Sequence, residues 1–228
     1  MKDVIEQIHS HASIRKYKSD PISEELLERI LVCGLRGSSS GNMQTWSVIS
    51  STDLAQRTRL YELHQKQEMI LQAPVVLTFC ADTARMRKWL NLRKAKDGFD
   101  DLLGFLAAAF DAIIAAQNIA LAAESNGLGI CYMGSTLFAS TELINELQLP
   151  PGVIPVTAMV LGYPDEAPEI RDRLPISAIW HKGAYQHQSN DEIDKIYQDR
   201  DVKGWIRYHK MYGEEYMAKL QADGIHNL

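Results

Sequence analysis

The spacing of apolar residues predicts several helices in the first third of the chain. Val4, Ile5 and Ile8 fall on one side of a short amphipathic helix. A second helix is predicted to begin after Ser23, whose side chain can cap it, and to end near Gly34. Its apolar face repeats every three or four residues, at Leu26, Leu27, Ile30 and Leu31. A third helix is expected over residues 53–63.

Two runs rich in β-branched residues, 73–82 and 154–164, have the length and composition of buried strands. Residues 45–51 alternate between apolar and polar positions, which predicts a further strand. The glycine-flanked stretch 129–134 and a predicted helix over 140–147 lie between the last two apolar runs. Three or four strands among more helix, without regular strand–helix alternation, indicate an α+β fold.

The longest apolar stretch runs from Leu102 to Glu124 and is long enough to be mistaken for a membrane span. Asp111, Gln117 and Asn118 interrupt it, and a charged residue at a bilayer centre costs about 2.5–3.5 kcal/mol. We therefore expect no membrane anchor. The stretch predicts a helix that is buried on most sides, crossing the middle of the fold or lining a subunit interface.

Two segments flank the predicted core. The charged stretch 85–101 predicts either a mobile excursion or an exposed helix. Residues 191–228 are predicted to be helical and carry many aromatic side chains, namely Tyr197, Trp205, Tyr208, Tyr212 and Tyr216. Because no repeat or flexible linker divides the chain, we expect residues 1–228 to form a single domain, with 191–228 as a helical C-terminal extension.

Composition narrows the class of protein. The 228 residues are 46% hydrophobic and 23% charged, which is typical of a globular protein. A formal net charge of −5 argues against a nucleic-acid binder, because binding along phosphates requires a basic face. Cys33, Cys80 and Cys131 have no metal-ligand or disulfide spacing, so we expect reduced thiols and no metal site. The N-terminus has no apolar signal-peptide centre, so we expect a cytoplasmic protein.

Familiar catalytic motifs do not account for the sequence. The glycines of residues 127–134 have the wrong spacing and context for a dinucleotide-binding fingerprint, and Gly127 and Gly129 are interpreted as a helix stop and a turn. No GxSxG, HExxH or Walker sequence is present, so hydrolytic chemistry has no visible machinery.

Polar residues instead suggest a site for an anionic ligand. Arg15 lies close to His11 and Ser13, and Arg171 and Arg173 are spaced so that both guanidinium groups face one side of an extended loop. Arginine pairs suit phosphate. Three serines and the amides of Asn42 and Gln44 add hydrogen-bonding groups at residues 38–44. Each residue alone is compatible with an ordinary surface charge, whereas together they indicate a phosphorylated ligand.

The chain resembles the FMN-dependent nitroreductase and flavin reductase family, in particular its branch of oxygen-insensitive NADPH nitroreductases and flavin reductase P. The resemblance covers nearly all residues up to about Pro175. Its main carriers are HASIRKY at 11–17, SSSGNMQ at 38–44, DAIIAAQNIALAAESNGLGICYMGS at 111–135 and IPVTAMVLGYPDEAPEIRDRLP at 154–175.

The resemblance implies a nitroreductase-like α+β fold, in which helices surround a mainly antiparallel sheet, and a homodimer with tightly but non-covalently bound FMN at the subunit interface. It places His11, Ser13 and Arg15 on the phosphate, the ribityl chain and the pyrimidine edge, with Arg171 and Arg173 closing on the phosphate. Other implied cofactor contacts are Ser39 and Ser40 from the partner subunit, the Gln67 amide on the isoalloxazine, and Tyr132, Gly134 and Ser135 near its reactive N5.

The implied activity is an NAD(P)H oxidoreductase that passes hydride through flavin N5 to nitroaromatic, quinone or flavin acceptors. Alternatives are a flavin enzyme of the same fold with different chemistry, such as a dehalogenase or flavin-cleaving enzyme, and a non-catalytic FMN-binding or redox-sensing protein. Ala12 stands where close relatives carry arginine. The tail also lacks the arginine-rich loop that holds the NADPH 2′-phosphate, which leaves Lys203 and Arg207, with Arg200 nearby, as candidates. The donor is therefore NADPH or NADH.

Overall fold

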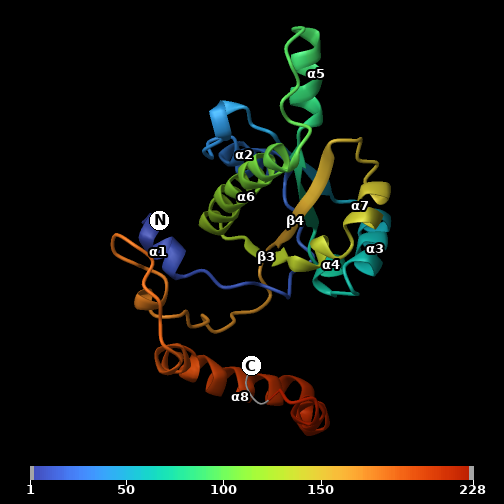
Figure 1. Ribbon diagram of the computed structural model, residues 1–228. Coiled ribbons are helices and arrows are strands. Elements are labelled where there is room, and N and C mark those ends of the chain that lie inside the picture. The colour runs from blue at the N-terminus through green and yellow to red at the C-terminus, as the bar shows by residue number, and fades with distance from the viewer. Residues whose placement is uncertain (1–2, 226–228) are drawn as a thin grey trace. The chain divides into compact units, whose positions relative to one another are not determined.

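A computed structural model describes residues 3–225 and divides the chain into two compact units, residues 1–170 and residues 171–228. The first unit holds a four-stranded antiparallel sheet with the order β1-β2-β4-β3 (Figure 1). Its strands are β1 (Trp46–Ser51), β2 (Val75–Asp82), β3 (Gly129–Met133) and β4 (Val153–Gly162). This architecture confirms the expected α+β fold with a mainly antiparallel sheet.

Helices cover both faces of the sheet (Figure 1). The helices of the first unit are α1 (Val4–His9), α2 (Glu24–Gly34), η1 (Ser40–Asn42), α3 (Leu54–Leu63), α4 (Met69–Gln72), α5 (Ala84–Leu92), α6 (Leu102–Ser125), η2 (Gly134–Leu137) and α7 (Ser140–Glu146). Alternate residues of β2 point to opposite faces, as the pleat of a strand requires. Leu77 and Phe79 pack with α2 and α6, whereas Val76 packs with α3, α4 and α7.

Several helix ends were predicted because they depend on local chemistry. The Ser23 hydroxyl accepts a hydrogen bond from the Leu26 amide at 3.2 Å, and Asp53 caps α3 in the same way. Gly127, with φ of +79°, follows the C-terminal cap of α6. Gly129 was expected to form a turn, but it is the first residue of β3. Glycine is required there because Ile14 packs closely against it, as described below.

Helix α6 is the long apolar element, and its burial differs from the expectation. One side packs in the core, with Ala112, Ala116 and Ile119 fully buried. The opposite side is exposed on the single chain, so of the two expectations this side fits a helix that lines a subunit interface, which stays a prediction. The exposed apolar side chains recur at helical spacing, at Leu103, Leu106, Phe110, Ile113 and Ile114. Length and composition alone would let α6 cross a membrane, but its inner side belongs to the core of the sheet.

The charged stretch 85–101 forms an exposed helix followed by an irregular segment. Helix α5 takes up its first part, and residues 93–101 connect α5 to α6. Arg87 ties this connection back to α5 through ion pairs with Asp97 at 2.6 Å and Asp100 at 3.0 Å. The exposed-helix alternative is therefore confirmed for residues 84–92.

The second unit contains η3 (Ile176–Ala178) and the long helix α8 (Asn190–Ala222). Ser189 and Glu192 form a reciprocal capping box at the start of α8. Gly213 interrupts the helical geometry with φ of +79°. The helical tail is thus confirmed within the described residues, whereas one domain with residues 191–228 as an extension stays a prediction.

Candidate functional site

The N-terminal segment that carries His11, Ser13 and Arg15 runs beside strand β3. The Ile14 amide donates to the Ile130 carbonyl at 2.9 Å, and the Lys18 amide donates to the Tyr163 carbonyl at 2.9 Å. The approach is close because Gly129 has no side chain: a Cβ there would stand 2.6 Å from Ile14 Cγ1. His11, Ser13 and Arg15, which are far from Tyr132 in the sequence, are therefore placed beside the strand that carries it.

Glu124 of α6 links two of these candidates. Its Oε1 lies 2.5 Å from His11 Nδ1, so one nitrogen of that imidazole is already engaged. Burial, and then the Glu124 carboxylate, raise the pKa of the Tyr132 hydroxyl. The Glu124 side chain is only 9% exposed. His11, which was expected on the phosphate, is thus oriented by a buried carboxylate that the sequence did not single out.

A second cluster joins the turn after α3 to the end of β3. His64 is fully buried, and its Nδ1 lies 2.8 Å from the Ser135 hydroxyl. Gln67 Nε2 donates to the same hydroxyl at 3.1 Å and to the His64 carbonyl at 3.0 Å. The predicted residues Gln67 and Ser135 therefore touch directly, and His64 connects them.

The burial of His64 predicts a pH-dependent stability. Burial lowers the pKa of His64 from 6.5 to about 4, so the unfolded chain takes up this proton before the folded protein does. This contribution is therefore complete above pH 6.5 and is lost as the pH falls from 6.5 towards 4. The linked loss in free energy of unfolding is about 3 kcal/mol.

Urea unfolding at a series of pH values measures this loss. His64→Asn, which cannot titrate, is the control, because carboxylates that titrate in the same range affect both proteins. The native protein should lose more stability between pH 6.5 and pH 4 than the variant. Parallel curves for the two proteins would contradict neutral burial of His64.

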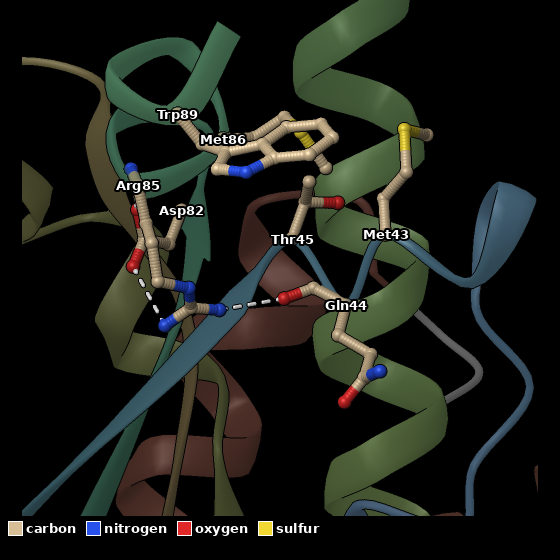
Figure 2. Close-up of a pocket in the computed structure, with 7 residues that line it drawn as sticks. All are labelled: Met43, Gln44, Thr45, Asp82, Arg85, Met86 and Trp89. Atoms are coloured by element: carbon tan, nitrogen blue, oxygen red, sulfur yellow. Dashed lines mark hydrogen bonds and ion pairs between the residues drawn. The ribbon is translucent and has the colours of Figure 1, made fainter. Parts of the chain in front are cut away.

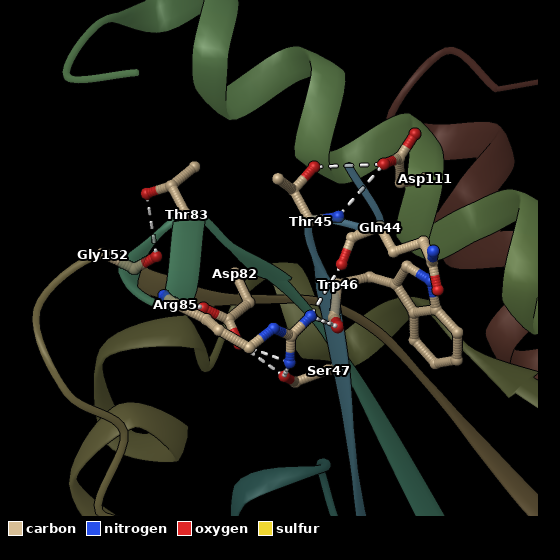
Figure 3. A network of polar contacts seen from close by, with 9 residues as sticks. All are labelled: Gln44, Thr45, Trp46, Ser47, Asp82, Thr83, Arg85, Asp111 and Gly152. Carbon is tan, nitrogen blue, oxygen red and sulfur yellow. Dashed lines mark hydrogen bonds and ion pairs between the residues drawn. The ribbon is translucent and has the colours of Figure 1, made fainter. Parts of the chain in front are cut away.

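The segment from Ser39 to Thr45 is organised by Asp111 of α6, which is only 2% exposed and whose contacts with Thr45 are drawn in Figure 3. Its Oδ2 accepts from the Ser39 hydroxyl at 2.7 Å, the Thr45 hydroxyl at 3.1 Å and the Thr45 amide at 3.2 Å. Its Oδ1 accepts from the Ser40 amide at 3.0 Å. Two hydroxyls and two backbone amides thus donate to one carboxylate.

This segment also contains unusual backbone angles. Gly41, Asn42 and Gln44 have φ of 57°, 55° and 53°, a left-handed region that non-glycine residues seldom adopt. For Asn42 and Gln44 such a conformation costs about 1–3 kcal/mol and persists only where surrounding contacts fix it, whereas glycine adopts it freely. The Ser39 hydroxyl supplies one such contact, because it also accepts from the Gln44 amide at 2.6 Å. The same hydroxyl donates its hydrogen to Asp111, so both hydrogen bonds of Ser39 stabilise the segment within this chain.

An open cavity of about 270 Å³ lies next to this segment, lined by Met43, Gln44, Thr45, Asp82, Arg85, Met86 and Trp89 (Figure 2). The Arg85 guanidinium donates to the carbonyls of Gln44 at 2.7 Å and Trp46 at 3.1 Å. It also pairs with Asp82 at 3.6 Å, as Figure 3 shows. Arg85 therefore ties the start of β1 to the end of β2 at the rim of the cavity.

In the second unit, Arg171 and Arg173 are both exposed. Arg173 donates to the backbone carbonyls of residues 171 and 172, at 3.1 Å in each case. Asp172 between them pairs with Lys203 Nζ at 3.3 Å and Arg207 Nη2 at 3.9 Å. The hydrogen bond from Lys203 is the main cause that lowers the pKa of Asp172. The two candidate contacts for a nucleotide phosphate therefore share one carboxylate.

The structure groups the predicted residues into separate clusters. His11, Ser13 and Arg15 lie beside β3, Gln67 and Ser135 touch, and Ser39 and Ser40 bind Asp111. Gly134 is exposed, and among the described residues nothing lies within 4 Å of the position that a Cβ would take there. The cofactor role of each of these residues stays a prediction.

Three buried residues that organise these clusters were not predicted: His64, Asp111 and Glu124. Asp111 left a signal, since a single carboxylate in an alanine-rich apolar helix requires a partner. No feature of the sequence points to His64 or Glu124, because their partners lie 71 and 113 residues away.

Comparison with known proteins identifies the family. The model of the Nitroreductase family matches residues 8–163. The chain is 36% identical over 198 residues to the NADPH-flavin oxidoreductase of Vibrio harveyi, covering 87% of this chain and 81% of that protein. It is 30% identical over 254 residues to FMN reductase [NAD(P)H] of Bacillus subtilis, covering 99% and 98%.

A solved structure agrees with these matches. The NADPH:FMN oxidoreductase from Vibrio harveyi complexed with NAD+ superposes with a TM-score of 0.81 and 32% identity, covering 96% of this chain and 92% of that chain. The fold is thus that of a nitroreductase, and this chain belongs to the Nitroreductase family.

Proposed function

We propose that this chain is an FMN-dependent NAD(P)H oxidoreductase that reduces nitroaromatic, quinone or flavin acceptors. Family membership and the names of its relatives, NADPH-flavin oxidoreductase and FMN reductase, support the class of reaction. The observation that carries the proposal is the Gln67–Ser135 contact next to the exposed Gly134. This arrangement offers polar groups and open backbone to one flat, hydrogen-bonding ligand.

The residues present fit a flavin ring. Gly134 has no positive φ, and no side chain packs against the position of its missing Cβ within the described chain, so neither strain nor packing requires glycine there. A glycine of this kind leaves the backbone open to close approach by a ligand. Gln67 and Ser135 add hydrogen-bonding groups beside it. Arg15 is exposed in the same unit, and its guanidinium, which donates to the Ser13 carbonyl at 3.5 Å, has further N–H groups to offer an anion.

FMN, when bound, would supply the redox chemistry between the nicotinamide and the acceptor. The protein's part is to bind and orient the ring. Gln67 and Ser135 would form hydrogen bonds with the polar edge of the ring, and Gly134 would let the ring approach the backbone. Asp111 fixes the position of Ser40. The contacts of Arg171 and Arg173 with the phosphate stay predictions carried by the family resemblance.

Anaerobic reduction tests the function. The purified protein should be yellow, and its flavin absorbance should bleach on addition of NADPH or NADH and return when a quinone or nitroaromatic is added. Retained FMN that neither nucleotide bleaches would instead favour a non-catalytic FMN-binding protein. A protein that binds no FMN would contradict the proposal.

Gly134→Val supplies a matched variant for this test. The added side chain points into open space, so the free energy of unfolding should change by about 0.5 kcal/mol or less. FMN affinity should fall by at least tenfold, because the valine occupies the space proposed for the ring. Unchanged FMN affinity in a folded variant would place the ring elsewhere.

We further propose that the protein is a homodimer in the cytoplasm and that α6 forms the subunit interface. The exposed side of α6 presents six apolar side chains, Leu102 and the five named above, and Phe110 alone is 61% exposed. Contiguous apolar surface of this kind marks an interface. Because Asp111 lies directly beside Phe110 and holds Ser39 and Ser40, this packing would bring the serine segment to the edge of the interface, in support of their proposed role across it.

The ion pairs of Asp172 predict a weak preference for NADPH. Lys203 and Arg207 are the candidates for the 2′-phosphate, and both pair with Asp172. We expect kcat/KM for NADPH to exceed that for NADH by about tenfold or less. Asp172→Asn should raise the NADPH value alone by roughly twofold to fivefold, because the carboxylate no longer competes with phosphate. If Asp172→Asn changed kcat/KM equally for NADPH and NADH, Lys203 and Arg207 would not contact the 2′-phosphate.

A further inference from the structure

His64 contacts Ser135 through its buried imidazole and Gln67 through its backbone carbonyl. It is completely excluded from solvent, and burial keeps it neutral. A neutral imidazole carries one N–H and one bare nitrogen, so its tautomer decides which group donates to Ser135. Three features of the cluster bear on the role of His64: the orientation of the Gln67 amide, the surroundings of His64 Nε2 and the backbone of residues 65–66.

The orientation of the Gln67 amide is fixed by the backbone. The His64 carbonyl can only accept, so the group that lies 3.0 Å from it must be the NH₂ of Gln67. The second hydrogen of the same NH₂ points to the Ser135 hydroxyl at 3.1 Å. Both donor positions of Gln67 are therefore used within the protein. Its side-chain carbonyl is left to accept a hydrogen bond from a ligand.

The His64 tautomer follows from its second nitrogen. Within the described chain, the buried Nε2 has no hydrogen-bond partner. A buried N–H without a partner is rarer and costlier than a buried acceptor without one, so the hydrogen belongs on Nδ1. Nδ1–H then donates to the Ser135 hydroxyl at 2.8 Å. Ser135 accepts from both His64 and Gln67, and its own hydrogen is free to be donated outward.

The backbone around His64 is held in an uncommon conformation. The next two residues, Gln65 and Lys66, have φ of 59° and 56°. Two consecutive left-handed residues without glycine persist only when neighbouring contacts fix them. The burial of His64 on one side, and the Gln67 hydrogen bonds on the other, supply such contacts. The turn therefore positions Gln67 and His64 as one unit.

We propose that His64 is a positioning residue: its imidazole, as the Nδ1–H tautomer, makes Ser135 a donor towards the cofactor, and its backbone carbonyl leaves Gln67 an acceptor. This inference rests on the proposed function. The oxidised isoalloxazine carries a single ring N–H, at N3, between carbonyl oxygens, and further acceptors at N1 and N5. A donor beside an acceptor on the protein is complementary to an edge of that kind.

Nitrogen-15 NMR of the full-length protein, with and without FMN, tests the tautomer directly. The Nδ1 resonance of His64 should have the shift and the one-bond proton coupling of a protonated nitrogen, and Nε2 should have those of a bare one, in both states. The opposite pattern would overturn the proposal. Because the apoprotein suffices for this measurement, its result is independent of whether the protein binds FMN.

A double-mutant cycle on FMN affinity tests the positioning role. Ser135→Ala should weaken FMN binding by about threefold to tenfold, the effect of one neutral hydrogen bond. His64→Leu should weaken it similarly in the native background and have no further effect in the Ser135→Ala background, because His64 acts through that hydroxyl. His64→Asn, whose amide can replace the Nδ1–H donor, should restore the native affinity.

The outcomes separate two failures. A full and independent effect of His64→Leu in the Ser135→Ala background would overturn the positioning role while leaving the proposed function intact. Failure of the native protein to bind FMN would overturn the proposed function instead. If His64→Leu does not fold, the NMR tautomer and the comparison of His64→Asn with Ser135→Ala decide the question.

Discussion

Asp111→Ala should lower the free energy of unfolding by about 4 kcal/mol or more. The substitution removes the acceptor for four buried or half-buried donors, from Ser39, Ser40 and Thr45. A buried donor without a partner costs about 1–3 kcal/mol, and hydrogen bonds to a charged group are the stronger kind. The left-handed residues of the same segment would also lose the contacts that hold them. Urea unfolding monitored by circular dichroism measures the loss.

Two further variants sharpen this prediction. Asp111→Asn can keep a carbonyl at the Oδ2 position, which accepts three of the four hydrogen bonds, so it should cost less than alanine. Asp20→Ala, at an exposed carboxylate, should change stability by about 0.5 kcal/mol or less. An Asp111→Ala protein as stable as the native one would show that the Ser39–Thr45 segment is held by other contacts.

Phe110→Glu should convert the proposed dimer to a monomer at micromolar concentrations. Burial of one phenylalanine contributes about 1.5–3 kcal/mol, and a twofold interface contains two copies, so the loss is about 3–6 kcal/mol before the cost of burying a charge. Phe110 is 61% exposed on a single chain, so the chain itself should still fold. Sedimentation velocity measures the association state, and flavin absorbance in the same experiment reports whether FMN stays bound.

Leu54→Glu is the matched control for this variant. Leu54 is 58% exposed at the start of α3, which covers the opposite face of the sheet from α6. A glutamate is favourable in the first turn of a helix, so neither folding nor association should change. If both variants dissociate, or neither does, α6 is not the interface.

The sequence alone predicted features that depend on neighbouring residues. Ser23 was predicted as a cap because its side chain can bind the amide three residues ahead, and the buried strands were visible from their β-branched runs. The exposed side of α6 was not predicted, because alanine and isoleucine look alike in a hydropathy pattern whichever side they occupy. Which side packs on β2 is settled by the tertiary fold.

The same limit applies to the candidate site. The family resemblance named Ser39, Gln67 and Ser135, but not the buried groups that orient them. Asp111 and His64 act through partners far along the chain, and no local pattern encodes such distances. The left-handed angles of Gln44 and Lys66 were equally hidden, since neither residue type favours them. They follow from contacts that form only in the folded protein.

The docking of Ile14 on β3 has a consequence for the solubility of the chain. Strand β3 is an edge of the sheet, and its outer amides and carbonyls would otherwise offer a template to another polypeptide. The segment around Ile14 meets that edge through one backbone hydrogen bond, from the Ile14 amide to the Ile130 carbonyl. Its next residues bind the stretch that follows β4, through the Lys18–Tyr163 and Asp165–Lys16 backbone hydrogen bonds and the isolated bridge between Tyr17 and Pro164. During synthesis this segment emerges first, yet its partner strand is made much later. Until then both lie open to intermolecular pairing, so the stretch that borders the candidate site also guards the protein against aggregation.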